Sequence, residues 1–165
     1  MRPRAIAILT VCVAMVCGST AIAARTREPI APSAGTTTGQ AEIRDLVARI
    51  NRHRRATGRP TVVWDDRLAQ VAQRHGEDMA RRGYFGHENP DGLDPFDRIE
   101  KAGIRFQAAA ENLASGQRTG AETFEAWMHS RGHRENLEGR DYTRIGIGLY
   151  RGRWTCLLMR PRRAR

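Results

Sequence analysis

Two histidines and one glutamate are the residues of this sequence whose chemistry best fits a shared site. His87 begins a turn-forming stretch, Glu111 lies in segment 108–114, and His133 lies in the run 127–137. Two imidazoles and a carboxylate are ligand types for zinc and several other divalent ions. However, the three positions are 24 and 22 residues apart, unlike the compact histidine pair of a helical zinc motif. Spacing alone therefore favours a separate structural role for each residue.

Other nucleophilic or ligating side chains have weaker support. Ser130 lies three residues before His133, but no Gly-x-Ser-x-Gly elbow marks it as a nucleophile, and it can simply end its helix. His75 lies near the apolar stripe of its helix, where a histidine is more often a hydrogen-bonded core residue than a ligand. Cys156 lies in an apolar run, so we expect it to be buried as a small apolar group. The alternative is a thiol that pairs two chains.

Apolar periodicity and capping residues predict the elements that position these side chains. Expected helices occupy residues 41–57, 66–82 and 95–102, and a fourth begins at Thr119. Apolar runs predict strands at 62–64, 104–106, 145–149 and 154–159, the last two joined by a hairpin. The segment 108–114 has no clear periodicity. Gly146 and Gly148 alternate with apolar residues, which implies that a helix packs closely on that face of the strand.

The N-terminal residues have the composition of an export signal. Residues 1–24 combine a basic start, an apolar run and a small-residue cleavage region, and residues 25–40 have the composition of a flexible tether. A retained membrane anchor is a weaker alternative, because a span needs about 18 apolar residues and Gly18 interrupts this run. A lipoprotein acylated at Cys17 is another. We therefore expect a secreted, periplasmic or cell-envelope protein with no transmembrane segment after cleavage.

The charge of the chain is strongly positive. The 165 residues carry a net charge of +10, and loss of residues 1–24 removes two arginines and no acid, which leaves +8. This charge suits an anionic envelope polymer or lipid. The basic residues are scattered and no aromatic residues interleave with them, so we expect no specific nucleic-acid partner. We expect one monomeric domain, residues 41–160, with a largely solvated basic surface and a basic tail, residues 161–165.

Six motifs follow one another in an order that suggests a family. They are residues 46–54, Trp64-Asp65-Asp66-Arg67-Leu68, Phe85-Gly86-His87, Ala110-Glu111-Asn112-Leu113-Ala114, residues 127–137 and residues 142–148. This order resembles the bacterial branch of the CAP superfamily, the SCP-like domains related to cysteine-rich secretory, antigen 5 and pathogenesis-related 1 proteins. The resemblance covers about residues 42–159. It implies an α+β fold, a single α-β-α sandwich with a small, mostly antiparallel sheet between helices.

The resemblance also implies a cleft lined by histidine and glutamate, but only half of the family's set of two histidines and two glutamates is carried over. His87 matches the first histidine, and Glu111 matches the glutamate of the Gly-Glu-Asn motif. The second glutamate falls on Ser130 and the second histidine on Asp141. We expect His133, from the Gly-His-Arg typical of the bacterial branch, to take the place of a missing member.

The expected cleft therefore contains the following residues: His87, Glu111, His133, Ser130, Asn112 and Tyr142. Its first three members are the candidate ligands of zinc or another divalent metal. An open position on such a metal would suit hydrolysis, for which Glu88 is the nearest candidate base. Without a metal, Glu111 would orient His87 by a hydrogen bond and leave a polar groove.

The functional hypothesis is a binding or interaction module at or beyond the cell envelope, rather than an enzyme. The resemblance implies a small lipid or glycan-like ligand. One alternative is a metal-dependent hydrolase or peptidase. Another is a basic surface module that docks on anionic envelope polymer or lipid.

Overall fold

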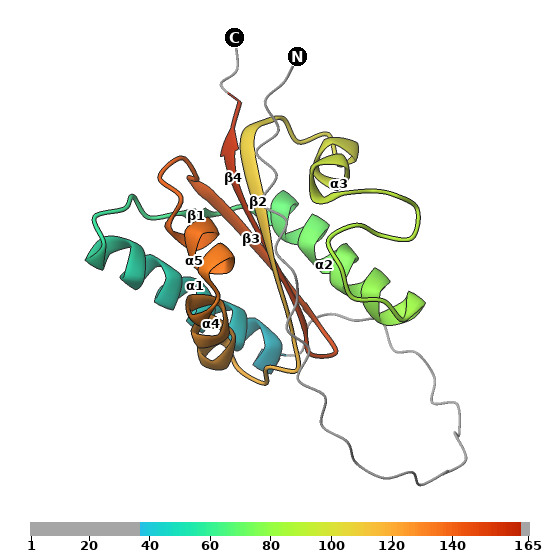
Figure 1. Ribbon diagram of the computed structural model, residues 1–165, viewed down its shortest axis with the longest axis horizontal. Coiled ribbons are helices and arrows are strands. Elements are labelled where there is room, and N and C mark those ends of the chain that lie inside the picture. The colour runs from blue at the N-terminus through green and yellow to red at the C-terminus, as the bar shows by residue number, and fades with distance from the viewer. Residues whose placement is uncertain (1–36, 163–165) are drawn as a thin grey trace, which may run out of the picture. The chain divides into compact units, whose positions relative to one another are not determined.

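The computed structural model describes residues 37–162, which belong to one compact unit, Gly35–Arg165. The expected signal peptide, most of the expected tether and the last three residues lie outside the described residues. Figure 1 shows the arrangement of the helices and strands. In chain order they are α1 Thr37–Ala56, β1 Val63–Trp64, α2 Asp66–Arg82, α3 Pro95–Lys101, β2 Phe106–Ser115, α4 Gly120–His129, α5 Arg131–Glu138, β3 Arg144–Tyr150 and β4 Arg153–Pro161.

A four-stranded sheet lies between two layers of helices (Figure 1), which confirms the predicted α-β-α sandwich. The strand order is β1-β3-β4-β2. The short β1 pairs parallel with β3, and the other two pairings are antiparallel. Helices α2 and α3 cover one face, and α1, α4 and α5 cover the other. The strand β2 is therefore an edge strand with helices on both sides.

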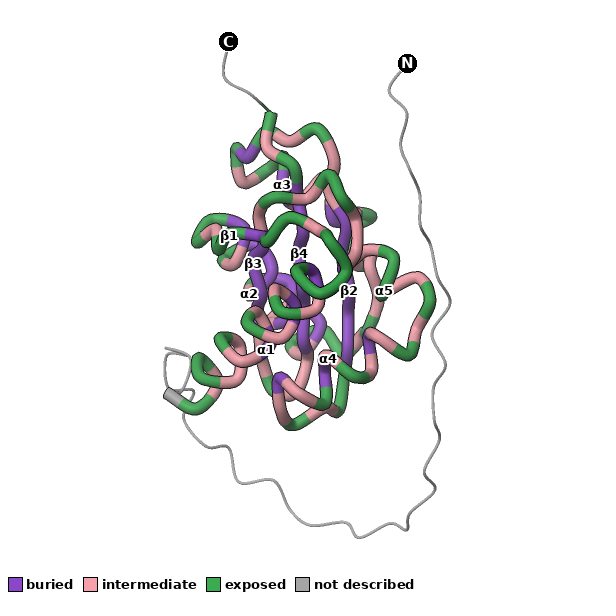
Figure 2. The backbone as a smooth tube through the Cα atoms, turned by 90° about the vertical axis from the view of Figure 1, so that its left-hand side faces the viewer, coloured by how far each residue is buried: buried purple, intermediate pink, exposed green. Residues whose placement is uncertain are grey.

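Side chains of the sheet and its helices form an apolar core on each face of the sheet. Figure 2 shows the central strands as the most continuously buried backbone. On the α2 and α3 face, the buried side chains are Leu68, Val71, Ala72, Ile99, Ile104, Leu157 and Met159. On the opposite face they include Leu46, Ile50, Trp127, Leu137, Ile145, Trp154, Cys156 and Leu158. Cys156 is fully buried, as expected, and burial raises the pKa of its thiol.

The close packing predicted from Gly146 and Gly148 is confirmed, and the helix concerned is α2. A Cβ atom on Gly146 would lie 2.2 Å from the backbone nitrogen of Ala69, and one on Gly148 would lie 2.3 Å from that of Gln73. Both distances are far below an ordinary contact. The two glycines therefore let the backbone of α2 rest directly on β3.

The predicted helix starts are confirmed by their caps. The Asp65 side chain accepts a hydrogen bond from Leu68 N at the start of α2. At α3, Asp94 and Asp97 form a reciprocal capping box around Pro95. These caps satisfy backbone N–H groups that have no partner within the helix.

Three local features differ from what the sequence indicates. Helix α1 begins at Thr37, four residues earlier than the apolar pattern indicates and inside the segment assigned to the tether. Residues 106–115 form one ten-residue strand, in which residues 110–114 are buried on both faces of the sheet and therefore show no apolar alternation. The separate helix α5 was not predicted; its eight residues are too few for a clear apolar period.

The prediction that the basic residues are solvated is wrong for Arg54, whose side chain is fully buried. Its guanidinium donates to four backbone oxygens, those of Pro60, Leu137, Gly139 and Tyr142. Burial, and next the charge of Arg59, lower the pKa of Arg54. Arg54 therefore ties α1 to the C-terminal end of α5, to the loop that follows it and to the segment before β1.

Candidate functional site

The centre of the candidate site is the carboxylate of Glu111, in the middle of the edge strand β2. Its side chain is 1% exposed. Glu111 is opposite Leu157 in the β2–β4 register, so its side chain lies on the α2 and α3 face of the sheet. A buried carboxylate is stable only when its oxygens are paired. Both oxygens have a partner here.

His87 is the first of these partners. Its Nδ1 lies 2.9 Å from Glu111 Oε1, and since a carboxylate only accepts hydrogen bonds, Nδ1 is the donor. The His87 side chain is 34% exposed. The hydrogen bond fixes the ring and leaves Nε2 as the nitrogen available to a ligand.

Arg98, on α3, is the second partner and was not predicted. Its Nη2 donates to Glu111 Oε2 at 2.8 Å. Its Nη1 donates to the backbone oxygens of His87 at 2.7 Å and Leu93 at 2.8 Å. The guanidinium thus attaches the loop that carries His87 to the edge strand. The sequence marks the start of α3 by a cap followed by proline, but no pattern shows which way Arg98 points.

His75, on α2, completes the buried layer beneath the site. Its Nε2 lies 3.0 Å from the oxygen of Gly86 and 4.0 Å from Glu111 Oε1. Desolvation outweighs the charge of Glu111 and lowers the pKa of His75. His75 is therefore a neutral, hydrogen-bonded core residue at neutral pH, as its position on the apolar stripe predicts.

His133 approaches the site from the other side of β2, on helix α5. Burial, and next the charge of His87, lower the pKa of His133, so the two rings lie within electrostatic range. The oxygen of His133 accepts a hydrogen bond from Asn112 Nδ2 at 2.9 Å. Asn112 is opposite Cys156 and therefore lies on the sheet face away from Glu111. Glu111 and Asn112 are adjacent on β2 and point to opposite faces of the sheet. Glu111 thus holds the His87 ring on one face, and Asn112 holds the backbone of His133 on the other.

Asn136 fixes α5 against the strand edge and was also not predicted. Its Nδ2 donates to Asn112 Oδ1 at 2.8 Å and approaches the oxygen of Glu111 at 3.4 Å. In addition, Trp127 Nε1 of α4 donates to the oxygen of Leu113 at 3.0 Å. These contacts occupy outward-facing carbonyls of β2, so α4 and α5 close the edge that the strand would otherwise expose.

Ser130 and Tyr142 are not connected to this hydrogen-bonded cluster within residues 37–162. Ser130 separates α4 from α5, and its side chain caps neither helix. Tyr142 packs against the core under α1 and α5, and burial raises the pKa of its hydroxyl. The residues brought together are thus His87, Glu111, Asn112 and His133.

The metal site of His87, Glu111 and His133 stays a prediction. Glu111 Oε1 is bonded to His87, and the positive guanidinium of Arg98 occupies Oε2. Among residues 37–162, no group of three or more histidine, cysteine, aspartate or glutamate side chains is placed to hold an ion. Glu111 instead has the position of a carboxylate that orients an imidazole from behind.

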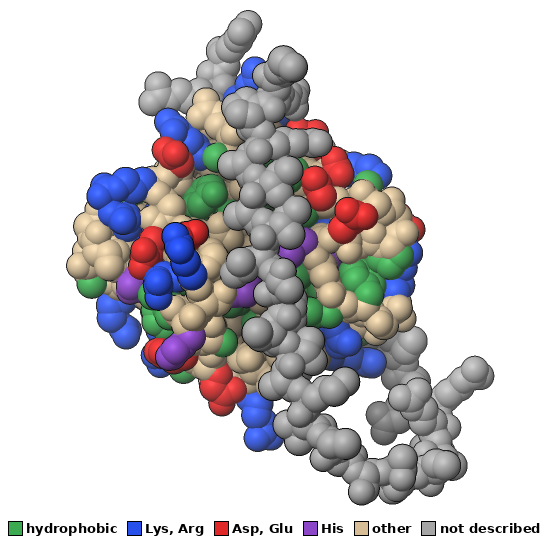
Figure 3. Space-filling model, viewed as in Figure 1, with side chains coloured by type: hydrophobic (Ala, Val, Ile, Leu, Met, Phe, Trp, Pro, Cys, Tyr) green, Lys and Arg blue, Asp and Glu red, His purple; other side chains and the backbone are tan. Residues whose placement is uncertain are grey.

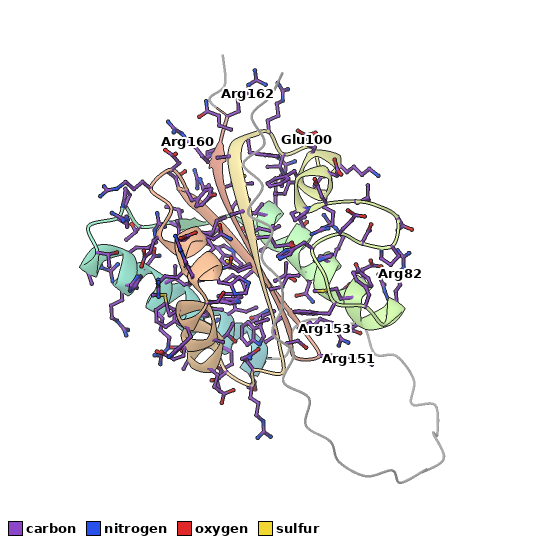
Figure 4. All side chains as sticks on the ribbon, viewed as in Figure 1. Arg82, Glu100, Arg151, Arg153, Arg160 and Arg162 are labelled. Carbon is purple, nitrogen blue, oxygen red and sulfur yellow. The ribbon has the colours of Figure 1, made fainter. Side chains whose placement is uncertain are left out.

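Basic side chains are spread over the visible face and interspersed with acidic ones (Figure 3). Figure 4 shows Arg151 and Arg153 at the β3–β4 turn and Arg160 and Arg162 at the far end of the same strand pair. Several surface arginines form ion pairs, such as Arg160 with Asp141 at 2.9 Å. None of the helices in the described ranges is long and apolar enough to cross a membrane.

Comparison with known sequences gives two bacterial relatives of similar identity. One is the uncharacterized protein YkwD of Bacillus subtilis (strain 168), 37% identical over 103 residues, which are 62% of this chain and 40% of the relative. The other is the uncharacterized membrane protein YlbC of the same strain, 37% identical over 119 residues, 72% of this chain and 34% of the relative. The chain thus spans less than half the length of each.

Solved structures share the fold. An extracellular protein containing an SCP domain, from Bacillus anthracis str. Ames, superposes with a TM-score of 0.72 at 30% identity, over 79% of this chain and 45% of that one. An outer surface protein from Borrelia burgdorferi superposes with a TM-score of 0.70 at 23% identity, over 74% of this chain and 95% of that one.

The family comparison agrees with the order of motifs and with the sandwich. Residues 47–158 match the CAP family, described as the cysteine-rich secretory protein family. This range includes every member of the cluster around Glu111. The chain therefore belongs to the CAP superfamily and contains a bacterial domain of the SCP type.

Proposed function

We propose that this CAP domain is a binding module that works outside the cytoplasm, at or beyond the cell envelope. Its ligand site is the group of residues at the edge of β2 that corresponds to the expected cleft: His87, Glu111, Asn112 and His133. The observation that carries the proposal is the hydrogen bond from His87 Nδ1 to the buried Glu111. It holds a partly exposed imidazole in one orientation, with Nε2 available.

The chemistry of the cleft suits a ligand with hydroxyl groups, as in the glycan-like class. His87 Nε2 offers an acceptor once Nδ1 has donated to Glu111. A neutral His133 offers one donor and one acceptor, and its lowered pKa favours this neutral form. Hydroxyl groups both donate and accept, so two imidazoles of this kind can recognise neighbouring hydroxyls of one ring.

Two observations support the location. Residues 1–24 have the composition of an export signal. The structural relative from Bacillus anthracis, at 30% identity, is described as extracellular. The location is tested by expressing the full chain in a bacterial host and assaying the culture medium and envelope fractions. Retention in the cytoplasm of the intact, uncleaved chain would contradict it.

The ligand site is tested by titrating the protein with soluble envelope glycan fragments, monitored by NMR. His87→Ala and His133→Ala should each weaken binding by about tenfold, as expected for one lost hydrogen bond in a cleft. His129→Ala is the matched control, because His129 is exposed and its Nδ1 bonds only to the oxygen of Glu125. Equal affinity in all four proteins would exclude the cleft.

A divalent metal is a second candidate occupant of the cleft, because a carboxylate behind an imidazole is the usual support of a ligating histidine. Within this chain, His87 and His133 would be the ligands and Glu111 the support. Zinc affinity of the same variants tests this. Loss of affinity in His87→Ala and His133→Ala but not in His129→Ala would support it, and unchanged affinity in all variants would exclude it.

A further inference from the structure

A separate pocket lies behind the cleft, between α2 and α3 and under the loop that joins them. Its volume is about 340 Å³, within the usual range for a small-molecule site. Its apolar wall consists of Val71, Leu93 and Ala102. Figure 1 shows the two helices side by side on the same face of the sheet, with the long connecting loop beside them.

Four cationic side chains line this pocket, and only one acidic side chain does. Arg74 and Arg81 are seven residues apart on α2 and so lie on one face of the helix. Lys101 and Arg98 come from α3. Within residues 37–162, no ion pair involves Arg74, Arg81 or Lys101. These three charges are thus available to a ligand.

The acidic side chain, Asp78, does not neutralise them. Its Oδ2 accepts a hydrogen bond from the Tyr84 hydroxyl at 2.6 Å and lies 3.7 Å from Arg82 Nη1. Asp91, in the connecting loop, is likewise bonded to Arg82 through both carboxylate oxygens. Arg82 lies at the C-terminal end of α2, beside that loop (Figure 4). Asp78 and Asp91 therefore pair with Arg82 and Tyr84 rather than with the cations that line the pocket, and the pocket keeps a positive charge.

Two further donors lie at the same wall. The Asn89 side chain uses its oxygen to accept from Asp91 N and Leu93 N. Its amide nitrogen makes only a 3.5 Å contact to Asp91. Arg98 Nε is buried without a hydrogen-bond partner in the described part of the chain, which is unusual for a buried donor.

We propose that this α2–α3 pocket binds the phosphate group of a small phosphate ester, through Arg74, Arg81 and Lys101. A phosphate carries up to two negative charges and three strong acceptor oxygens, which matches several converging cationic donors better than a single carboxylate does. The apolar wall accommodates a short aliphatic part such as glycerol. The ester is either a free solute or the headgroup of an anionic lipid.

This pocket is distinct from the cleft of the proposed function, but the two share a wall. Arg98 and His75 line the pocket, and they hold Glu111 and the backbone next to His87 from behind. The test therefore uses pocket residues that do not contact Glu111.

The experiment is calorimetric titration of the full chain with glycerol 1-phosphate and with inorganic phosphate. Arg74→Gln/Arg81→Gln should weaken binding by roughly tenfold or more, since two charge-assisted contacts are lost. The matched control is Arg52→Gln/Arg55→Gln, which removes the same charge from exposed positions of α1 on the opposite face of the sheet. The control should change affinity by less than about twofold, because exposed distant charges are screened. His87→Ala should also leave phosphate binding unchanged, which separates this site from the cleft.

Equal weakening in both double variants would overturn the proposal, because binding would then reflect overall charge. Absence of binding to the unaltered chain would overturn it as well. If the pocket variant unfolds, Lys101→Gln provides the same comparison from α3. A second arm uses phosphatidylglycerol vesicles. Vesicle binding that glycerol 1-phosphate displaces, and that the pocket variant loses, identifies a lipid headgroup as the source. Binding of glycerol 1-phosphate without vesicle binding identifies a free ester.

Discussion

His87 Nδ1 lies 2.9 Å from Oε1 of Glu111, and the Glu111 side chain is buried in the middle of an edge strand. The exposed imidazole therefore takes its orientation from a carboxylate that solvent does not reach. The second oxygen of this carboxylate is held by Arg98. Removing either Glu111 or Arg98 would leave the other charge buried without its partner.

Glu111→Ala should lower the free energy of unfolding by about 3–5 kcal/mol, because it leaves the guanidinium of Arg98 buried without its partner. Chemical denaturation measures this. Glu135→Ala is the matched control, since it breaks the exposed pair with Arg131, and such pairs contribute at most about 1 kcal/mol. Equal losses would mean that Glu111 is not the structural centre of the site.

Gly148→Ala should destabilise the domain by about 1–3 kcal/mol or more, because the added Cβ would lie 2.3 Å from Gln73 N of α2. Gly76→Ala should instead stabilise the domain. Its Cβ would make only ordinary contacts, the nearest at 3.6 Å from the oxygen of Arg153, and alanine favours a helix over glycine by about 0.5–1 kcal/mol. Thermal melts of both variants test the pair, and a stable Gly148→Ala protein would contradict the close packing.

Arg54→Ala should cost at least about 3 kcal/mol of unfolding free energy, since several charge-assisted hydrogen bonds to backbone oxygens are lost. Arg54→Lys should recover little of it, because an ammonium cannot reproduce the planar guanidinium fork. Arg52→Ala, at an exposed position of the same helix, is the control, expected within about 0.5 kcal/mol. Comparable melts of Arg54→Ala and Arg52→Ala would disprove the buried role.

Stability should fall as the pH drops below about 6.5, because burial lowers the pKa of His75 from its ordinary value of 6.5. The unfolded chain binds a proton on this side chain in that range and the folded chain resists it, so acid favours unfolding. Above the ordinary pKa both states are neutral and the effect disappears. Chemical denaturation at several pH values between 5 and 8 measures this loss of stability, since the range extends roughly one pH unit or more on each side of the ordinary histidine pKa. His75→Gln should make the free energy of unfolding less dependent on pH in this range. An unchanged pH dependence would contradict the lowered pKa of His75.

The sequence predicted the fold better than it predicted the site. Caps at Asp65 and Asp94 mark helix starts by local hydrogen bonding, and they are confirmed. Gly146 and Gly148 indicated the packing of a helix on β3 because only a close approach requires such a pattern. Only the start of the ten-residue β2 was predicted, because residues 110–114 are buried on both faces and show no alternation.

The site residues that were missed act through tertiary contacts. Arg98 and Asn136 lie on short helices, and the face that each helix turns to β2 depends on packing across the sheet. In the sequence, Arg54 cannot be told apart from the exposed arginines beside it, and only its hydrogen bonds to four backbone carbonyls distinguish it. Tyr142 was assigned to the cleft from its motif, whereas the structure shows it half-buried and packed against the core.

The central claim is that Glu111 orients His87 for a ligand in the cleft, and ¹⁵N NMR of the imidazole nitrogens tests it directly. We expect that His87 carries its proton on Nδ1, that a bound glycan fragment shifts the signals of His87 Nε2 and the His133 ring, and that His129 does not respond. A His87 ring protonated on Nε2 in the neutral form, with both cleft histidines unaffected by every fragment, would contradict it.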